Sequence, residues 1–230
     1  NGFCTGTLLN NCNNDGTPYF LTANHCMEGT GSNVIFRFNW SSPQCAANQN
    51  GPMNQSVAGY TLLHSSAGSD VALLRLNTTP PPSYNVYYSG WDRSAPAPSG
   101  GVTCIHHPSG DIKKISFENQ PVTPSSFSGA QCWRVADWDD GTTEPGSSGS
   151  GLWNQNKLLI GQLYGGSAAC GNNGSDYFGR FSVSFPALQQ WLGNCGNTLQ
   201  GYPNSGIGIE ELGRVGGLET WPNPATDEVT

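Results

Sequence analysis

The sequence predicts an all-β fold, made of many short strands and not of alternating strands and helices. Apolar or β-branched runs recur at short intervals, and the chain has 31 glycines and 16 prolines but only 11% charged residues. Short strands at regular spacing, joined by Gly- and Pro-rich turns, are typical of sandwiches and barrels. At 230 residues, the chain can form one large β domain or two small ones with a sizeable core.

The expected strands fill most of the first 183 residues. Those before the Pro-rich stretch are 6–9, 19–22, 34–38, 60–63 and 71–76. Those after it are 86–88, 102–105, 112–117, 132–135, 158–163 and 177–183. The Pro-rich stretch 79–84 and the loop 92–101 mark the region, 79–101, in which two β modules would join.

One segment near the end of this region is predicted to be helical. Within 186–192, Leu188, Trp191 and Leu192 fall on one helical face, and Gly193 follows as a stop signal. Beyond Cys195 the chain becomes rich in Gly and Asn and loses its periodicity. Residues 1–195 are therefore expected to form the folded part, and residues 196–230 a linker.

Charge and hydropathy exclude several classes of partner. A net charge of −7 and a pI near 4.8 disfavour binding to nucleic acid or to an anionic membrane. No apolar run approaches the roughly 18 residues that a membrane span needs. The chain opens at Asn1 inside what resembles a strand, without a signal peptide, so we expect a processed or truncated segment whose N-terminal strand is missing.

The cysteines indicate an oxidising compartment. There are eight, at positions 4, 12, 26, 45, 104, 132, 170 and 195, and none has the C-x-x-C spacing of a structural zinc site. An even number of cysteines without metal spacing favours disulfides over metal binding. We therefore expect a protein that acts outside the cytoplasm, as a monomer.

A Gly- and Ser-rich stretch, 142–151, contains the first candidate for chemistry. Ser148 has glycines on both sides, so its hydroxyl can be exposed on a tight turn. Such a loop can aim the N–H groups of Gly146 and Ser148 at one point, where an oxyanion would form. Composition alone also allows a flexible linker, but Trp138 before the loop and the apolar run 158–160 after it indicate a packed region. We interpret the stretch as the nucleophile loop of a serine endopeptidase.

Such a nucleophile needs a base. His25 is a candidate, because it ends an apolar strand and lies beside Cys26, which can tether it. A structural histidine at a strand end is the alternative. His106 and His107 are a competing pair, but adjacent residues on a strand point to opposite faces. With Pro108 after them, we expect them to have a turn role.

The base in turn needs an orienting group, for which Asp70 is the candidate. It precedes the apolar run 71–74, so its carboxylate enters a buried region and requires a partner. The N–H of His25 is a suitable one. A strand-capping Asp is the alternative for Asp70 taken alone. The presence of Ser148, His25 and Asp70 together supports the catalytic interpretation more strongly than any one of them.

The motifs 22–26, 69–74 and 144–150 resemble the His, Asp and Ser motifs of chymotrypsin-fold serine proteases, and in particular those of bacterial lysyl endopeptidases. The order His, Asp, Ser and the Ser at position 150 exclude the G-x-S-x-G elbow of α/β-hydrolases. The resemblance covers about residues 3–193. Its further matches are 19–22, 90–93, 105–108, 161–163, 175–176 and 179–180.

The resemblance implies two six-stranded antiparallel β-barrels with the site between them. It makes Ser148 the nucleophile, His25 the general acid and base, and Asp70 the group that orients His25. The N–H groups of Gly146 and Ser148 would form the oxyanion hole, and the mechanism needs no metal or other cofactor. Ser147 stands where trypsin-like animal enzymes have an Asp that binds a freed N-terminus, so that salt bridge is not expected here.

The resemblance also implies a disulfide and a substrate pocket. Cys4 and Cys26 would form the bridge that clamps the His25 loop. Asp176 would lie at the base of the S1 pocket and pair with a basic P1 side chain, although without the resemblance it reads as a turn residue. Tyr164, Gly165 and Gly166 would line the subsite, with Tyr164 in place of a His of the lysyl enzymes.

These expectations add up to a secreted serine endopeptidase that cleaves proteins or peptides after basic residues, with Lys favoured and Arg allowed at P1. One alternative is a preference for Glu or small residues at P1, and another is an inactive homologue that only binds a partner. The tail segment 220–227 resembles the opening of the sorting domains read by the type IX secretion system. A Pro-rich linker is the other reading of that segment.

Overall fold

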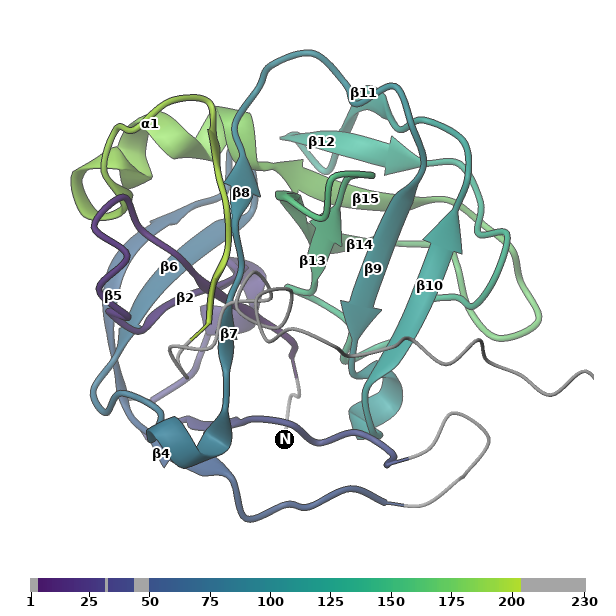
Figure 1. The fold of residues 1–230 in the computed structure, drawn as a ribbon. Helices are drawn as coiled ribbons and strands as arrows, with labels where there is room; N and C mark the ends of the chain where they lie inside the picture. Colours follow the sequence, from purple (N-terminus) through teal and green to yellow (C-terminus); the bar gives the residue numbers. More distant parts are fainter. Residues whose placement is uncertain (1–3, 32, 44–49, 204–230) are drawn as a thin grey trace, which may run out of the picture.

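The computed structural model describes residues 4–31, 33–43 and 50–203. Strands dominate this part of the chain, and the single α-helix follows the last long strand, so the all-β prediction with one short C-terminal helix is confirmed. Figure 1 places β2, β5 and β6 on one side of the molecule and β9 to β15 on the other, with β7 and β8 between them.

The first half of the chain contains β1 (Thr7–Leu9), β2 (Tyr19–Ala23), η1 (His25–Met27), β3 (Ile35–Arg37), β4 (Ser56–Ala58), β5 (Tyr60–Ser66), β6 (Val71–Leu76), η2 (Pro82–Tyr84), β7 (Tyr87–Tyr88) and β8 (Trp91–Asp92). The second half contains β9 (Val102–His106), η3 (Pro108–Gly110), β10 (Lys114–Glu118), β11 (Thr123–Phe127), β12 (Ala130–Val135), β13 (Gly151–Trp153), β14 (Leu159–Gly166), β15 (Asp176–Arg180), α1 (Phe181–Leu192), β16 (Thr198–Leu199) and β17 (Tyr202–Pro203).

The N-terminal strands form a four-stranded antiparallel sheet in the order β1-β2-β6-β5, beside the β3–β4 pair. Strand β6 is buried on both faces, which explains its unbroken apolar sequence. Val71 and Leu73 point into a core shared with α1, whereas Ala72 and Leu74 point into a second core that contains Phe36. The alternation of side chains along a strand produces this division.

The C-terminal strands form a second sheet in the order β10-β9-β13-β14-β15-β12-β11, which β8 and β16 join at β14. All its pairings are antiparallel except that of β8 with β14. Its core packs around Trp133, Trp138 and Phe178. Because β8 lies in the predicted junction region, the connection between the two modules is itself part of the second sheet.

Helix α1 begins at Phe181, five residues earlier than the sequence predicts, and the expected strand 177–183 ends at Arg180. Phe181, Phe185, Leu188 and Leu192 are fully buried and repeat at helical spacing. Pro186 hid this start, because a proline inside a helix removes a hydrogen bond. The helix accommodates it on the exposed face.

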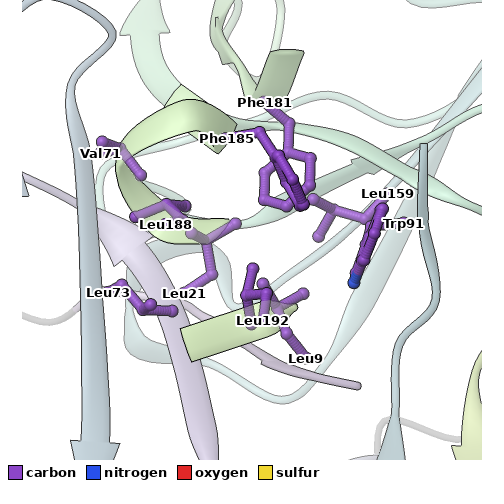
Figure 2. Packing of buried hydrophobic residues seen from close by; sticks show 10 residues of the cluster. All are labelled: Leu9, Leu21, Val71, Leu73, Trp91, Leu159, Phe181, Phe185, Leu188 and Leu192. Atoms are coloured by element: carbon purple, nitrogen blue, oxygen red, sulfur yellow. The ribbon is translucent and has the colours of Figure 1, made fainter. Parts of the chain in front are cut away.

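The buried face of α1 packs on Leu9, Leu21, Val71, Leu73, Trp91 and Leu159, as Figure 2 shows. This cluster joins the helix to strands of both sheets. Among the ring pairs of this cluster, Trp91 and Phe185 are the closest, with centroids 4.8 Å apart. The helix therefore fixes the position of one sheet against the other.

We expect Phe185→Ala to lower the free energy of unfolding by about 3–5 kcal/mol, because it opens a cavity in this shared core. Phe117→Ala is the matched control, since that ring is 40% exposed, and it should change stability by no more than about 0.5 kcal/mol. Urea unfolding of both variants makes the comparison. A loss below about 1 kcal/mol for Phe185→Ala would show that α1 does not hold the sheets together.

Part of the segment assigned to a linker is structured. Strand β16 pairs with β8, and β17 pairs with β7. The Cys12–Cys195 disulfide fastens the chain just before these strands. The boundary at 195 is therefore corrected to at least 203, while the remaining linker residues and the sorting motif 220–227 lie outside the described residues.

The expectation of disulfides is confirmed for four of the described cysteines. Cys4 pairs with Cys26 and Cys12 with Cys195, but Cys104, Cys132 and Cys170 are free thiols. Burial raises the pKa of Cys104 to about 12 and that of Cys132 to about 11, so both remain protonated and inert. They act as small apolar core residues. Cys45 lies outside the described residues.

No helix among the described residues has the length and apolar character needed to cross a membrane.

Candidate active site

The pairing of two strands brings His25 and Asp70 together. Strands β2 and β6 are antiparallel neighbours, and Ala23 lies opposite Val71 at one end of the pair. The two residues that follow β2, Asn24 and His25, therefore meet Asp70, the residue that precedes β6. His25 Nδ1 lies 2.8 Å from Asp70 Oδ2, and the backbone N–H of His25 donates to Asp70 Oδ1 over 3.0 Å.

This geometry fixes the orientation of the His25 ring. Both oxygens of the Asp70 carboxylate accept a hydrogen bond from residue 25, and the carboxylate is only 2% exposed. An acceptor at Nδ1 places the ring proton there and leaves Nε2 free to take a proton. The predicted pair of base and orienting group is thus assembled in the fold.

The second sheet holds the Asp70 turn. Asp70 has a left-handed backbone, with φ of 48°, which is unfavourable for a side chain with a Cβ. The Gln162 side chain on β14 donates to the carbonyls of Ser69 and Asp70, over 2.8 and 3.2 Å. Contacts from the second sheet therefore help to orient the Asp70 carboxylate, which belongs to the first sheet.

Ser148 lines the same cavity as His25, a space of about 1520 Å³ that also touches Thr5, Trp40 and Phe36. The His25 side chain is 31% exposed there. Among the hydrogen bonds of the described residues, none joins Ser148 Oγ to His25. In enzymes without substrate this contact is often long, and it shortens when substrate binds.

In the nucleophile loop, some backbone N–H groups donate hydrogen bonds within the described structure and others do not. Those of Ser147, Gly149 and Ser150 donate to the carbonyls of Glu144, Leu163 and Ser147, over 2.9, 2.7 and 3.0 Å. Within the described part of the chain, no acceptor is bonded to the N–H of Gly146 or of Ser148. The free pair is the one that the sequence assigns to an oxyanion hole.

The carbonyls of the same two peptide planes explain this orientation. Pro145 O accepts from the Ser109 N–H over 2.7 Å, and Ser147 O accepts from the Ser150 N–H over 3.0 Å. In a trans peptide the N–H points opposite to the C=O. Anchoring these carbonyls therefore fixes the directions of the N–H groups of Gly146 and Ser148, which point away from the Ser109 and Ser150 contacts.

Thr5 anchors the loop from the first module, a role for which the sequence carries no recognisable signal. Its N–H donates to Ser148 O over 2.8 Å, and its hydroxyl donates to Gly146 O over 2.9 Å. Gly149 makes this approach feasible. It has φ of 80°, and a Cβ there would overlap the Thr22 hydroxyl and the Thr5 carbonyl.

Tyr164 covers one face of the His25 ring. The two rings stack with centroids 5.4 Å apart and planes 24° from parallel. Phe127 then meets Tyr164 edge to face at 5.2 Å. Phe127 lies in a hairpin far from both residues in sequence, so only the fold reveals its place beside the base.

Asp176 begins β15 and is fully buried, which removes the reading as a turn residue. Its Oδ2 accepts from Trp138 Nε1 over 2.8 Å and from Thr143 Oγ1 over 2.6 Å. Oδ1 has no hydrogen-bond partner among the described residues and is buried. Burial raises the pKa of this carboxyl, against the lowering effect of hydrogen bonds from the Thr143 and Trp138 side chains and of a backbone hydrogen bond from Ala168.

The unpartnered oxygen of Asp176 lies beside Gly166, where a Cβ would overlap it. Gly165 and Gly166 pair with β15 at the end of the strand that carries Tyr164. The cavity shared by His25 and Ser148 does not include Asp176, Tyr164, Gly165 or Gly166. The structure thus groups the predicted substrate-binding residues with each other, next to His25, and keeps Asp176 closed to solvent.

The sequence interpretation of His106 and His107 as turn residues is wrong for His106. It is the last residue of β9, only 1% exposed, and its Nδ1 lies 2.7 Å from Ser147 Oγ. His107 points the other way and stacks on Trp40 with centroids 5.6 Å apart.

In the residues that the structure describes, the only set of three potential ligands is Cys4, His25 and Cys26. The two sulfurs of this set are joined in a disulfide, so they cannot act as thiolate ligands.

Comparison with known proteins gives one family. Residues 1–179 match the family model described as lysyl endopeptidase, C-terminal domain. The lysyl endopeptidase of Pseudomonas aeruginosa is 35% identical over 202 residues, which cover 82% of this chain and 43% of the relative. This chain therefore spans less than half the length of that relative.

Solved structures share the fold at low sequence identity. The HtrA-type protease AlgW with a decapeptide superposes with a TM-score of 0.59 at 14% identity, over 82% of this chain and 51% of AlgW. The active form of the Rv3671c protease from M. tuberculosis gives a TM-score of 0.54 at 15% identity, over 84% and 74% of the two chains. At such identities, the likeness shows a common fold.

Proposed function

Because this chain belongs to the family of lysyl endopeptidase C-terminal domains, we propose that it is a serine endopeptidase with Ser148, His25 and Asp70 as its catalytic triad. The observation that carries the proposal is the buried Asp70 carboxylate, which accepts two hydrogen bonds from residue 25 at a cavity that Ser148 also lines. Burying a carboxylate costs free energy unless it is paired, and the partner of Asp70 is an imidazole that lines the same cavity as Ser148.

We propose the following reaction. Ser148 Oγ attacks the carbonyl carbon of the scissile bond while its proton passes to His25 Nε2. The resulting oxyanion accepts from the N–H groups of Gly146 and Ser148. His25 returns the proton to the leaving amine, the C–N bond breaks, and an acyl ester remains on Ser148. Water, deprotonated by His25, then hydrolyses the ester and restores the serine.

We assign the choice of substrate to Asp176. Among the described residues, its Oδ1 is a buried acceptor without a hydrogen-bond partner, and a Lys or Arg side chain at P1 would supply a cation to it. A neutral P1 residue leaves the carboxylate unpaired, so discrimination against it is expected to be strong. Since Asp176 is closed to solvent, the segment around Gly166 must shift to admit the P1 side chain.

Cleavage outside the cytoplasm fits the two disulfides, which persist in oxidising compartments. We propose that the protein is secreted and acts on proteins or peptides as a monomer. The proposal that secretion uses the type IX system rests only on the sequence motif 220–227.

A fluorophosphonate probe tests the proposal, because it reacts with an activated serine and not with ordinary hydroxyls. We expect the parent protein to be labelled and Ser148→Ala to lose all labelling. Ser182→Ala is the control, since its hydroxyl is buried in α1 and has no hydrogen-bond partner in the part of the chain that the structure describes, and it should label like the parent. A parent protein that stays unlabelled would favour the inactive homologue that only binds a partner.

A further inference from the structure

A chain of buried hydrogen bonds runs from the nucleophile loop through His106 to β10. Ser147 Oγ lies 2.7 Å from His106 Nδ1, and His106 Nε2 lies 3.2 Å from Ser116 Oγ. Ser116 donates to Thr142 O over 2.8 Å, and the Glu144 N–H donates to Ser147 Oγ over 3.1 Å. The side chains of Ser147, His106 and Ser116 are each no more than 1% exposed.

The groups at the two ends of this series of hydrogen bonds, the Thr142 carbonyl and the Glu144 N–H, fix the direction of every bond between them. A carbonyl can only accept, so the single hydroxyl proton of Ser116 goes to Thr142. Ser116 Oγ must then accept from His106 Nε2–H. A neutral imidazole with its proton on Nε2 has a bare Nδ1, which accepts the hydroxyl proton of Ser147. Each group is satisfied by this one arrangement, and it requires the neutral ring.

The surroundings of His106 keep it neutral. The pKa of His106 is lowered to about 4, chiefly by burial and to a lesser extent by the neighbouring His107, against a smaller raising effect of the Glu144 carboxylate. An added proton on Nδ1 would face the Ser147 hydroxyl, which would lose its acceptor. All of these hydrogen bonds can therefore form together only when His106 is uncharged.

This network holds the residue between the two oxyanion donors. Ser147 lies between Gly146 and Ser148, and a fixed Ser147 limits the rotation of both adjoining peptides. The same segment supplies a second contact, since the Ser109 N–H holds the peptide plane of Gly146 from the turn that follows β9. His106 at the end of β9 and the turn 108–110 therefore both hold the nucleophile loop in place.

We propose that His106 is a positioning residue for the oxyanion N–H groups, which it holds through Ser147 as a neutral, Nε2-protonated imidazole. This inference rests on the proposed function of Ser148 as nucleophile. Removing a donor from an oxyanion hole lowers kcat by about 10²–10³-fold. Loosening two donors that remain present should cost less, about 10–10²-fold, with KM changed little because the effect falls on the transition state.

The test compares His106→Ala, Ser147→Ala and His106→Asn. We expect the first two to lower kcat by about 10–10²-fold and to weaken inhibition by a peptide aldehyde, whose adduct carries an oxyanion, by a similar factor. Asn can present an acceptor near the Nδ1 position, so His106→Asn should recover part of the loss. Ser182→Ala is the control, because its buried hydroxyl lies in α1, outside the cavity that Ser148 and His25 share, and it should keep the parental kcat.

Two results would overturn the inference. One is a parental kcat and aldehyde affinity in Ser147→Ala, whatever His106→Ala does. The other comes from nitrogen NMR of the parent labelled in its four histidines, which does not depend on any variant folding: we expect a neutral His106 with its proton on Nε2, and a proton on Nδ1 contradicts the proposed chain. A parent that neither hydrolyses peptides nor reacts with the fluorophosphonate would instead refute the proposed function.

Discussion

Asp70→Asn is expected to lower kcat by about 10⁴-fold, by analogy with the same change in other triad proteases. In this protein both oxygens of Asp70 accept from residue 25, one from the backbone N–H and one from the ring. An amide has a single acceptor oxygen, so its NH₂ must face one of these donors. If it faces the ring, the His25 proton moves to Nε2, and the base can no longer accept the proton of Ser148.

The measurement is single-turnover hydrolysis of a peptide ester and a peptide amide by parent and variant. Asp139→Asn is the control, since it removes the same charge from an exposed position on the second module. It should keep the parental rate. A loss below about tenfold for Asp70→Asn would mean that His25 is not the base, or that its ring is oriented by another group.

The second large effect concerns the choice of substrate. We expect Asp176→Asn to lower kcat/KM for substrates with Lys at P1 by about 10²–10⁴-fold, because a buried charge pair loses one partner. Substrates with a neutral P1 residue should be cleaved no more slowly than by the parent. A peptide library with Lys, Arg, Gln, Glu and Ala at P1 measures both effects at once.

The stability of this variant separates a specificity role from a structural one. Burial raises the pKa of Asp176, so folding disfavours its ionised form, and any stability that the neutral carboxyl contributes is lost as pH rises through the folded pKa. Asn is neutral and can still accept from Trp138 and Thr143. Asp176→Asn should therefore be at least as stable as the parent at pH 7. An unchanged Lys preference, or a library without enrichment of basic P1 residues, would remove Asp176 from the specificity pocket.

The sequence predicts the triad because each member lies in a local motif next to an apolar strand. Strand pairing explains why these motifs meet, since β2 and β6 are adjacent and bring residues 25 and 70 to one end. The strand pattern also yields the all-β class. The helix start predicted from the sequence is wrong. Pro186 locally disfavours a helix, whereas the buried face of the helix begins at Phe181.

Other parts of the site depend on contacts between residues distant in sequence. Thr5 is 141 residues from Gly146, and His106 is 41 residues from Ser147. No periodicity or spacing marks such pairs, because each member looks ordinary in its own segment. The free thiols of Cys104 and Cys132 are a similar case, since only the fold shows that they are buried apart from other cysteines.

The central claim is that one hydroxyl, that of Ser148, is activated by the His25–Asp70 pair. Peptide mapping by mass spectrometry after reaction with a fluorophosphonate tests this most directly. The account predicts a single phosphonylated residue, Ser148, at one adduct per chain, and no adduct in the Asp70→Asn protein over the same reaction time. An adduct on another serine or threonine, or equal modification of Ser148 in the Asp70→Asn protein, would contradict it.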